Sequence, residues 1–180
     1  MKENLNESIK SAQLKAQYLI GTSNLDDVFP LNVEQLATEL GIDLQYGQFS
    51  QNISGVLKRK NKEGCPVIII NSADSPVRQR FTIAHELGHY LLHSQKLLHV
   101  DSNFETVYFR DENSSRANKI EEIQANAFAA ELLMPSKDLE DQFKKLSTQN
   151  LENIVIILAK RYQVSTTAMA IKVNKVLENI

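Results

Sequence analysis

Apolar residues recur at helical spacing over much of this 180-residue chain. Between residues 4 and 20 they fall every three or four positions, with polar residues between them, which predicts an amphipathic helix. A shorter helix is expected over 33–40, where Asn32 can cap the first turn and Gly41 can end the helix. Because the apolar stripe of an amphipathic helix needs a partner surface, the pattern predicts packed helices.

The pattern changes to that of strands between residues 42 and 70. IDLQYGQF (42–49) alternates, ISGVLKR (53–59) and PVIII (66–70) are rich in β-branched residues, and NKEG (61–64) can form the turn between the last two. These segments predict a small antiparallel sheet of about three strands.

Helical spacing returns after the third strand. Ser75 as N-cap and Pro76 at the first helical position predict a helix over 76–93. Residues 94–115 lack clear periodicity and predict a long loop, with a short strand at TVYF. The remaining helices are expected over residues 116–133, 136–146, 150–162 and 165–179.

Together these elements predict an α+β fold, with the sheet packed beside a helical bundle. Residues 1–135 are expected to form the core, and residues 136–180 a helical subdomain packed on it.

Composition narrows the class of protein. The chain is 42% hydrophobic with a formal net charge of -2, which gives no overall attraction to polyanions or anionic membranes. Cys65 is a single cysteine, which excludes an internal disulfide, and the N-terminus lacks the apolar core of a signal peptide. No apolar run reaches the roughly 18 residues of a membrane span. We therefore expect a soluble cytoplasmic protein.

The segment RFTIAHELGHYLLH (80–93) holds three of the four histidines. His85, Glu86 and His89 spell H-E-x-x-H on the expected helix. Positions i and i+4 lie about 40° apart around the axis with a rise of about 6 Å, so both imidazoles can bind one cation, typically zinc. Glu86 lies on the flank of that face, where its carboxylate can act as a base toward a metal-bound water.

A catalytic zinc site needs a third protein ligand besides an open position for water. His93 cannot supply it on a continuous helix, because about 12 Å of rise separates it from His85, against Zn–N bonds of about 2.1 Å. Glu122 is the better candidate, with Asn126 one turn later on the same face to support the metal-binding carboxylate. Glu121 is the alternative and points about 100° away.

Two segments of the chain resemble the signature helices of the ImmA/IrrE family metallo-endopeptidases, which are gluzincin-like zinc proteases. These segments are RFTIAHELGHYLLH and EEIQANAFAAELLMP. The resemblance covers roughly residues 30–170. It implies Zn²⁺ held by His85, His89 and Glu122, with Glu86 as the catalytic base, so that residues 1–135 would be a zinc metallopeptidase core.

The resemblance further implies regulated cleavage of a specific intracellular protein. The implied substrate is a helix-turn-helix transcriptional repressor, often encoded beside the protease in a phage or mobile element, so that cleavage regulates transcription. The residue that stabilises the oxyanion stays open among Tyr108, Arg110 and His93, and His99 is expected to be solvated in loop sequence.

Two other functions remain as alternatives. A zinc-bearing interaction module could bind a repressor without cutting it, although an intact Glu86 argues against this. The segment LAKRYQVSTTAMAIKVNKV has the layout of a helix-turn-helix, with Lys172 and Lys175 on its second helix. That helix is mostly apolar, so direct nucleic-acid binding is not expected.

Overall fold

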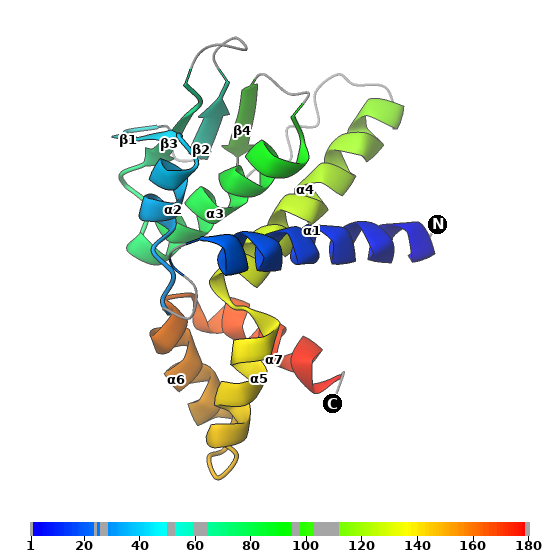
Figure 1. The fold of residues 1–180 in the computed structure, drawn as a ribbon, viewed down its shortest axis with the longest axis vertical. Helices are drawn as coiled ribbons and strands as arrows, with labels where there is room; N and C mark the ends of the chain where they lie inside the picture. Colours follow the sequence, from blue (N-terminus) through cyan, green and yellow to red (C-terminus); the bar gives the residue numbers. More distant parts are fainter. Residues whose placement is uncertain are drawn as a thin grey trace.

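A computed structural model describes the chain at residues 2–23, 25, 29–49, 53–59, 65–94, 98–102 and 112–178. In chain order the helices and strands are α1 (Lys2–Thr22), α2 (Val33–Glu39), β1 (Asp43–Gly47), β2 (Ile53–Lys58), β3 (Val67–Asn71), α3 (Pro76–Leu92), β4 (Leu98–Ser102), α4 (Glu112–Leu133), α5 (Ser136–Lys145), α6 (Leu151–Tyr162) and α7 (Thr166–Leu177). The predicted α+β class is confirmed (Figure 1).

The sheet is mixed and has four strands among the described residues, in the order β1-β3-β2-β4. β2 pairs antiparallel with both β3 and β4, whereas β1 runs parallel to β3. The expected sheet of three antiparallel strands is therefore corrected in two ways. β4 lies within the segment predicted as a loop, and β1 takes the edge of β3 that the β2 hairpin leaves open. The expected NKEG turn and TVYF strand lie outside the described residues.

The predicted starts of α2 and α3 are confirmed by their caps. The Asn32 side chain accepts a hydrogen bond from the Gln35 backbone N–H, and Ser75 caps α3 in the same way. Gly41, at φ 71°, follows α2 in the left-handed region that favours glycine. The helix carrying Glu122 begins earlier than predicted, at Glu112 rather than 116.

α3 is the central helix, with β2 and β3 on one side and α4 against another (Figure 1). Glycines allow both close approaches. A Cβ on Gly55 of β2 would lie 2.4 Å from Thr82 Cγ2, and one on Gly88 of α3 would lie 3.1 Å from Ala125 Cα of α4. The sheet and α4 are therefore in close contact with the helix that carries the histidines.

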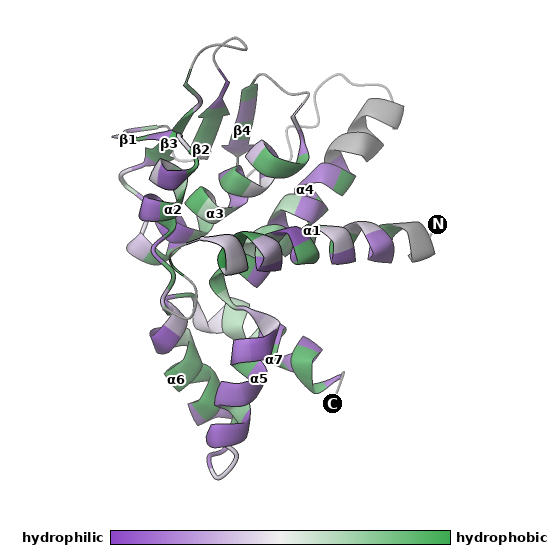
Figure 2. Ribbon diagram, in the orientation of Figure 1, coloured by the Kyte–Doolittle hydropathy of each residue, from purple (hydrophilic) through white to green (hydrophobic). Residues whose placement is uncertain are grey.

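The C-terminal helices α5 to α7 gather at the end of the molecule away from the sheet (Figure 1). Figure 2 shows hydrophobic residues along much of α6, and the buried Leu158 and Tyr162 join the main core cluster. Among the described residues no single helix is long and apolar enough to cross a membrane; α6 and α7 meet that criterion only as a pair bent by 113°. The proposed boundary at residue 135 stays a prediction.

α6 and α7 form the bend expected of a helix-turn-helix, but α7 does not present its lysines as a DNA-reading helix would. Lys172 is buried and forms an ion pair with Glu131 of α4, while Ile171 beside it is 55% exposed. Lys175 is left on the surface of α7. A reading helix needs several polar or basic side chains toward the groove, whereas one of the two lysines of α7 is buried in the ion pair with Glu131.

Candidate metal centre

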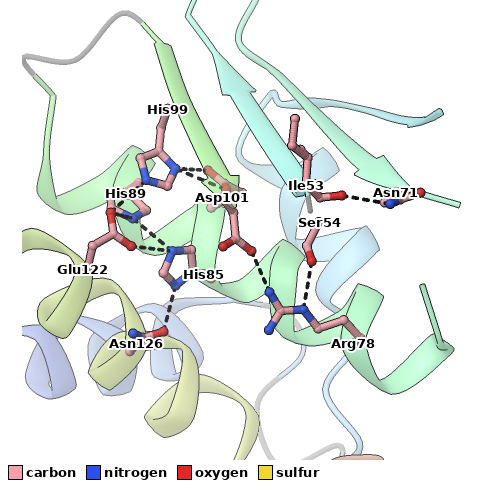
Figure 3. Close-up of polar contacts among 11 residues, drawn as sticks. Ile53, Ser54, Asn71, Arg78, His85, His89, His99, Asp101, Glu122 and Asn126 are labelled. Carbon is pink, nitrogen blue, oxygen red and sulfur yellow. Dashed lines mark hydrogen bonds and ion pairs between the residues drawn. The ribbon is translucent and has the colours of Figure 1, made fainter. Parts of the chain in front are cut away.

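Four potential ligands from three elements converge beside the sheet (Figure 3). His85 and His89 extend from α3, Glu122 from α4 and His99 from β4, and one donor atom of each lies within 4.8 Å of the others. The structure therefore brings together the three ligands expected from the sequence and adds a fourth side chain that the sequence did not suggest.

The donor spacing fits a tetrahedral metal ion. His85 Nε2 lies 3.0 Å from His89 Nε2 and 3.3 Å from Glu122 Oε2, and His89 Nε2 lies 3.4 Å from Glu122 Oε1. Zinc–ligand bonds of about 2.0 to 2.1 Å in tetrahedral geometry place two donors about 3.3 to 3.4 Å apart. Imidazole nitrogen and carboxylate oxygen are also ligands that zinc accepts. The residues present therefore fit zinc.

Asn126 fixes the ring of His85. Its Oδ1 lies 3.0 Å from His85 Nδ1, so the ring donates its Nδ1–H there and keeps the lone pair of Nε2 for the cluster. We expected this amide to support Glu122, and the structure shows that it supports a histidine instead. Asn126 follows Glu122 by one turn of α4, so one helix supplies both a donor and the partner of a second donor.

Replacing Asn126 with alanine is expected to weaken metal binding by about 10- to 100-fold, the usual effect of removing the hydrogen-bond partner of a liganding histidine. Asn126 is exposed and alanine is a better helix former than asparagine, so we expect the variant to fold as wild type does. Asn126→Asp keeps an acceptor for Nδ1–H and should retain near wild-type affinity. Zinc titration against a chelating dye measures both; equal affinities in wild type and Asn126→Ala would contradict the role.

Burial and hydrogen bonds hold two groups of the cluster, His89 and Glu122, in their metal-binding protonation states. Burial lowers the pKa of His89 to about 3, so this imidazole is neutral at pH 7. Burial alone would raise the pKa of Glu122, but hydrogen bonds from His85, His89 and His99 outweigh it and hold that pKa well below its ordinary value. At neutral pH the cluster thus offers a neutral imidazole and an ionised carboxylate.

Glu86 is fully buried next to the cluster. Burial raises the pKa of its carboxyl group, and the neighbouring His99 opposes that shift by hydrogen bonding. The Nδ1 of His99 lies 3.0 Å from Glu86 Oε2 and 3.2 Å from Oε1. A carboxylate whose pKa is raised toward neutrality is suited to accept and return a proton.

His99 was expected in solvated loop sequence, and the structure corrects this. It is 8% exposed and lies in β4, opposite Leu57 of β2. Its Nε2 lies 2.9 Å from Glu122 Oε1, so the ring connects Glu86 to Glu122. Hydrogen bonds to these two carboxylates overcome the effect of burial and raise the pKa of His99 to about 9.

An ion pair fixes the strand that carries His99. Asp101 of β4 lies 3.1 Å from Arg78 of α3, whose Nε also donates to Ser54 of β2 (Figure 3). β4 is therefore attached both to the sheet and to the helix of the first two histidines. The strict alternation in LHVDS was the signal available in the sequence, and it places His99 and Asp101 on one face.

The other sequence candidates lie outside the cluster. His93 follows the last turn of α3, and its Nε2 lies 3.2 Å from the backbone oxygen of Glu121, in agreement with the argument that it cannot reach the same ion. Glu121 is not part of the cluster. Cys65 is exposed, and its thiol donates a hydrogen bond to the backbone oxygen of Gly41. Tyr108 and Arg110 lie outside the described residues.

Comparison with known proteins agrees with this geometry. Residues 37–174 match the IrrE N-terminal-like domain. The chain is 36% identical over 103 residues to the radiation response metalloprotease IrrE of Deinococcus radiodurans, and 35% identical over 102 residues to the protein of the same name from Deinococcus deserti. The matched region covers 57% of this chain in both cases, but 29% and 34% of the respective relatives.

Proposed function

Because the chain belongs to the family of IrrE N-terminal-like domains, we propose that it is a zinc-dependent endopeptidase. In this proposal His85, His89 and Glu122 hold the metal, and Glu86 is the catalytic base. The observation that carries it is the tetrahedral spacing of the three donors beside a buried carboxylate.

Bound zinc would supply a water of lowered pKa and polarise the scissile carbonyl. The protein supplies the proton transfers. Glu86 takes the proton of the attacking water and returns it to the nitrogen of the leaving amine, which its raised pKa allows. Asn126 holds the His85 ring in the tautomer that presents Nε2. Glu122, whose side chain is 41% exposed, marks the side of the cluster that a substrate can approach.

The proposed substrate is a specific intracellular protein, a helix-turn-helix repressor, and the proposed location is the cytoplasm. The resemblance to ImmA/IrrE proteases supports this substrate class, since regulated cleavage of such repressors is what that family implies. The helices after residue 135 form the proposed C-terminal subdomain, which would pack on the core or contact the protein substrate. The apolar exposed side chains Ile156, Ile157 and Ile171 lie on these helices, and they suit a protein partner better than DNA.

Co-expression with a candidate helix-turn-helix repressor, followed by assay of the purified pair, tests the proposal. We expect wild type with zinc to cut the repressor, and Glu86→Gln to cut about 10²- to 10⁴-fold more slowly, because the substitution removes the base. Zinc binding should persist in the variant, because Glu86 is not one of the proposed ligands.

Two results would count against the proposal. Undiminished cleavage by Glu86→Gln would show that another group is the base. Binding of the repressor without cleavage by wild type, across a panel of such repressors, would favour the alternative of a zinc-bearing interaction module.

A further inference from the structure

The ring of His99 lies between the proposed base and the proposed metal ligands. Its Nδ1 faces both oxygens of Glu86, at 3.0 and 3.2 Å, and its Nε2 faces Glu122 Oε1 at 2.9 Å. A water activated at the metal by Glu86 would have to occupy the same space between Glu86 and the metal ligands. The side chain is therefore in the place where the nucleophile would stand.

We propose that His99 is a fourth protein ligand of the metal, and that it closes the centre until a bound substrate displaces it. This inference rests on the proposed zinc site. Liganding histidines almost always donate their second ring N–H to a carboxylate, backbone carbonyl or water, and His99 meets this description with Nδ1 on Glu86 and Nε2 toward the cluster.

The surroundings of His99 position its ring toward the cluster. Its ring stacks on that of His89, with centroids 3.6 Å apart and an interplanar angle of 24°. The backbone is held in register by Leu57 of β2, and the Arg78–Asp101 ion pair holds the strand two residues further on. A side chain placed by a sheet and an ion pair can meet the angular demands of a metal better than one on a free loop.

The closed arrangement has a direct consequence for the chemistry. Zinc with four protein ligands has the form of a structural site, whereas catalysis needs an open position. While Glu86 is hydrogen-bonded to His99, its carboxylate also cannot accept a proton from an attacking water. Displacement of one ring therefore frees the fourth position and the base together.

Cobalt, which substitutes for zinc and absorbs visible light, provides the test without any cleavage assay. We expect His99→Ala and His99→Gln to bind Co²⁺ about 10-fold or more weakly than wild type, with a changed visible spectrum as solvent replaces a nitrogen donor. His99→Gln keeps a hydrogen-bond donor for Glu86 but is a poor ligand, so it separates the two roles. His93→Ala is the matched control and should resemble wild type, because His93 lies outside the cluster.

A small competing ligand gives the second measurement. Acetohydroxamate should bind the cobalt form of His99→Ala at least about 10-fold more tightly than the wild-type form, because the fourth position is open in the variant. Circular dichroism of each variant shows whether it is folded, and an unfolded His99→Ala is replaced by His99→Gln in both measurements.

The inference is overturned if both variants keep wild-type cobalt affinity and spectrum, or if His99→Gln behaves as wild type while only His99→Ala is altered. Equal acetohydroxamate affinity in wild type and variants also overturns it. These outcomes are separate from the proposed substrate: a wild-type protein that binds cobalt but cuts no repressor counts against the endopeptidase proposal alone, and one that binds no cobalt overturns both.

Discussion

Replacing Glu122 with alanine is expected to lower zinc affinity by at least about 100-fold, more than the loss expected for removing a partner behind a ligand. The carboxylate is the acidic oxygen donor of the cluster, and it lies 3.3 Å from His85 Nε2 and 3.4 Å from His89 Nε2. The alanine variant loses both the donor and the negative charge that offsets the metal. Isothermal titration with zinc, or competition with a chelating dye, measures the change.

Glu121→Ala is the matched control, because it removes the same side chain one position earlier on α4. Glu121 lies outside the cluster, so this variant should bind zinc as wild type does. The pair also decides between the two glutamates that the sequence offered as third ligand. A greater loss of affinity in Glu121→Ala than in Glu122→Ala would contradict the assignment.

Replacing Lys172 with methionine is expected to reduce the free energy of unfolding by about 3–5 kcal/mol, the usual cost of removing one partner from a buried ion pair. The side chains of Lys172 and Glu131 are 7% and 1% exposed. The lysine also donates to Ser136 Oγ at 2.9 Å, and Gln17 of α1 donates to Glu131 Oε1 at 2.8 Å. Urea denaturation at pH 7, at a fixed zinc concentration, measures the loss.

The difference between wild type and this variant should depend on pH. Burial would raise the pKa of Glu131, but the charge of Lys172 and several hydrogen bonds outweigh it and lower that pKa. The stabilisation is therefore fully present above the unfolded pKa of about 4.3, and it is lost as pH falls through the folded value. We expect the free energy of unfolding of the wild type to fall more steeply with decreasing pH than that of Lys172→Met. The difference in stability between the two proteins should therefore narrow below about pH 4.

Lys160→Met on α6 removes an exposed lysine and should change stability by no more than about 0.5 kcal/mol. Comparable stability of Lys172→Met and Lys160→Met at pH 7 would show that the buried pair contributes little.

Local patterns were sufficient to predict the helices and to place the imidazoles of His85 and His89 on one face of α3. The spacing of His85 and His89 places both on one face of a helix, and Ser75 with Pro76 marks where that helix starts. The choice of Glu122 over Glu121 needed the resemblance as well as the geometry. Its position in the cluster depends on the approach of α4 to Gly88, which no local pattern contains.

His99 could not be assigned for a different reason. Its strand is five residues long, and it pairs with residues of β2 that lie 40 to 49 positions earlier in the chain. The alternation is also inverted, with Leu98 and Val100 exposed at 57% and 42% while His99 is buried, so the usual reading of apolar residues as the inner face fails. Lys172 shows the converse error, because a lysine on a short helix is normally on the surface.

Gly55 carries a lesson for protein engineering. Its missing side chain lets bare strand backbone lie over Thr82 and Glu86, so part of the acidity of that glutamate is set from outside its own helix. Transplanting the five-residue motif onto the solvent face of a designed helix would reproduce two imidazoles at the correct pitch, yet leave the carboxylate hydrated and as acidic as any surface glutamate. A design that is meant to catalyse as well as to bind metal therefore also needs a strand that covers the glutamate and excludes water from it.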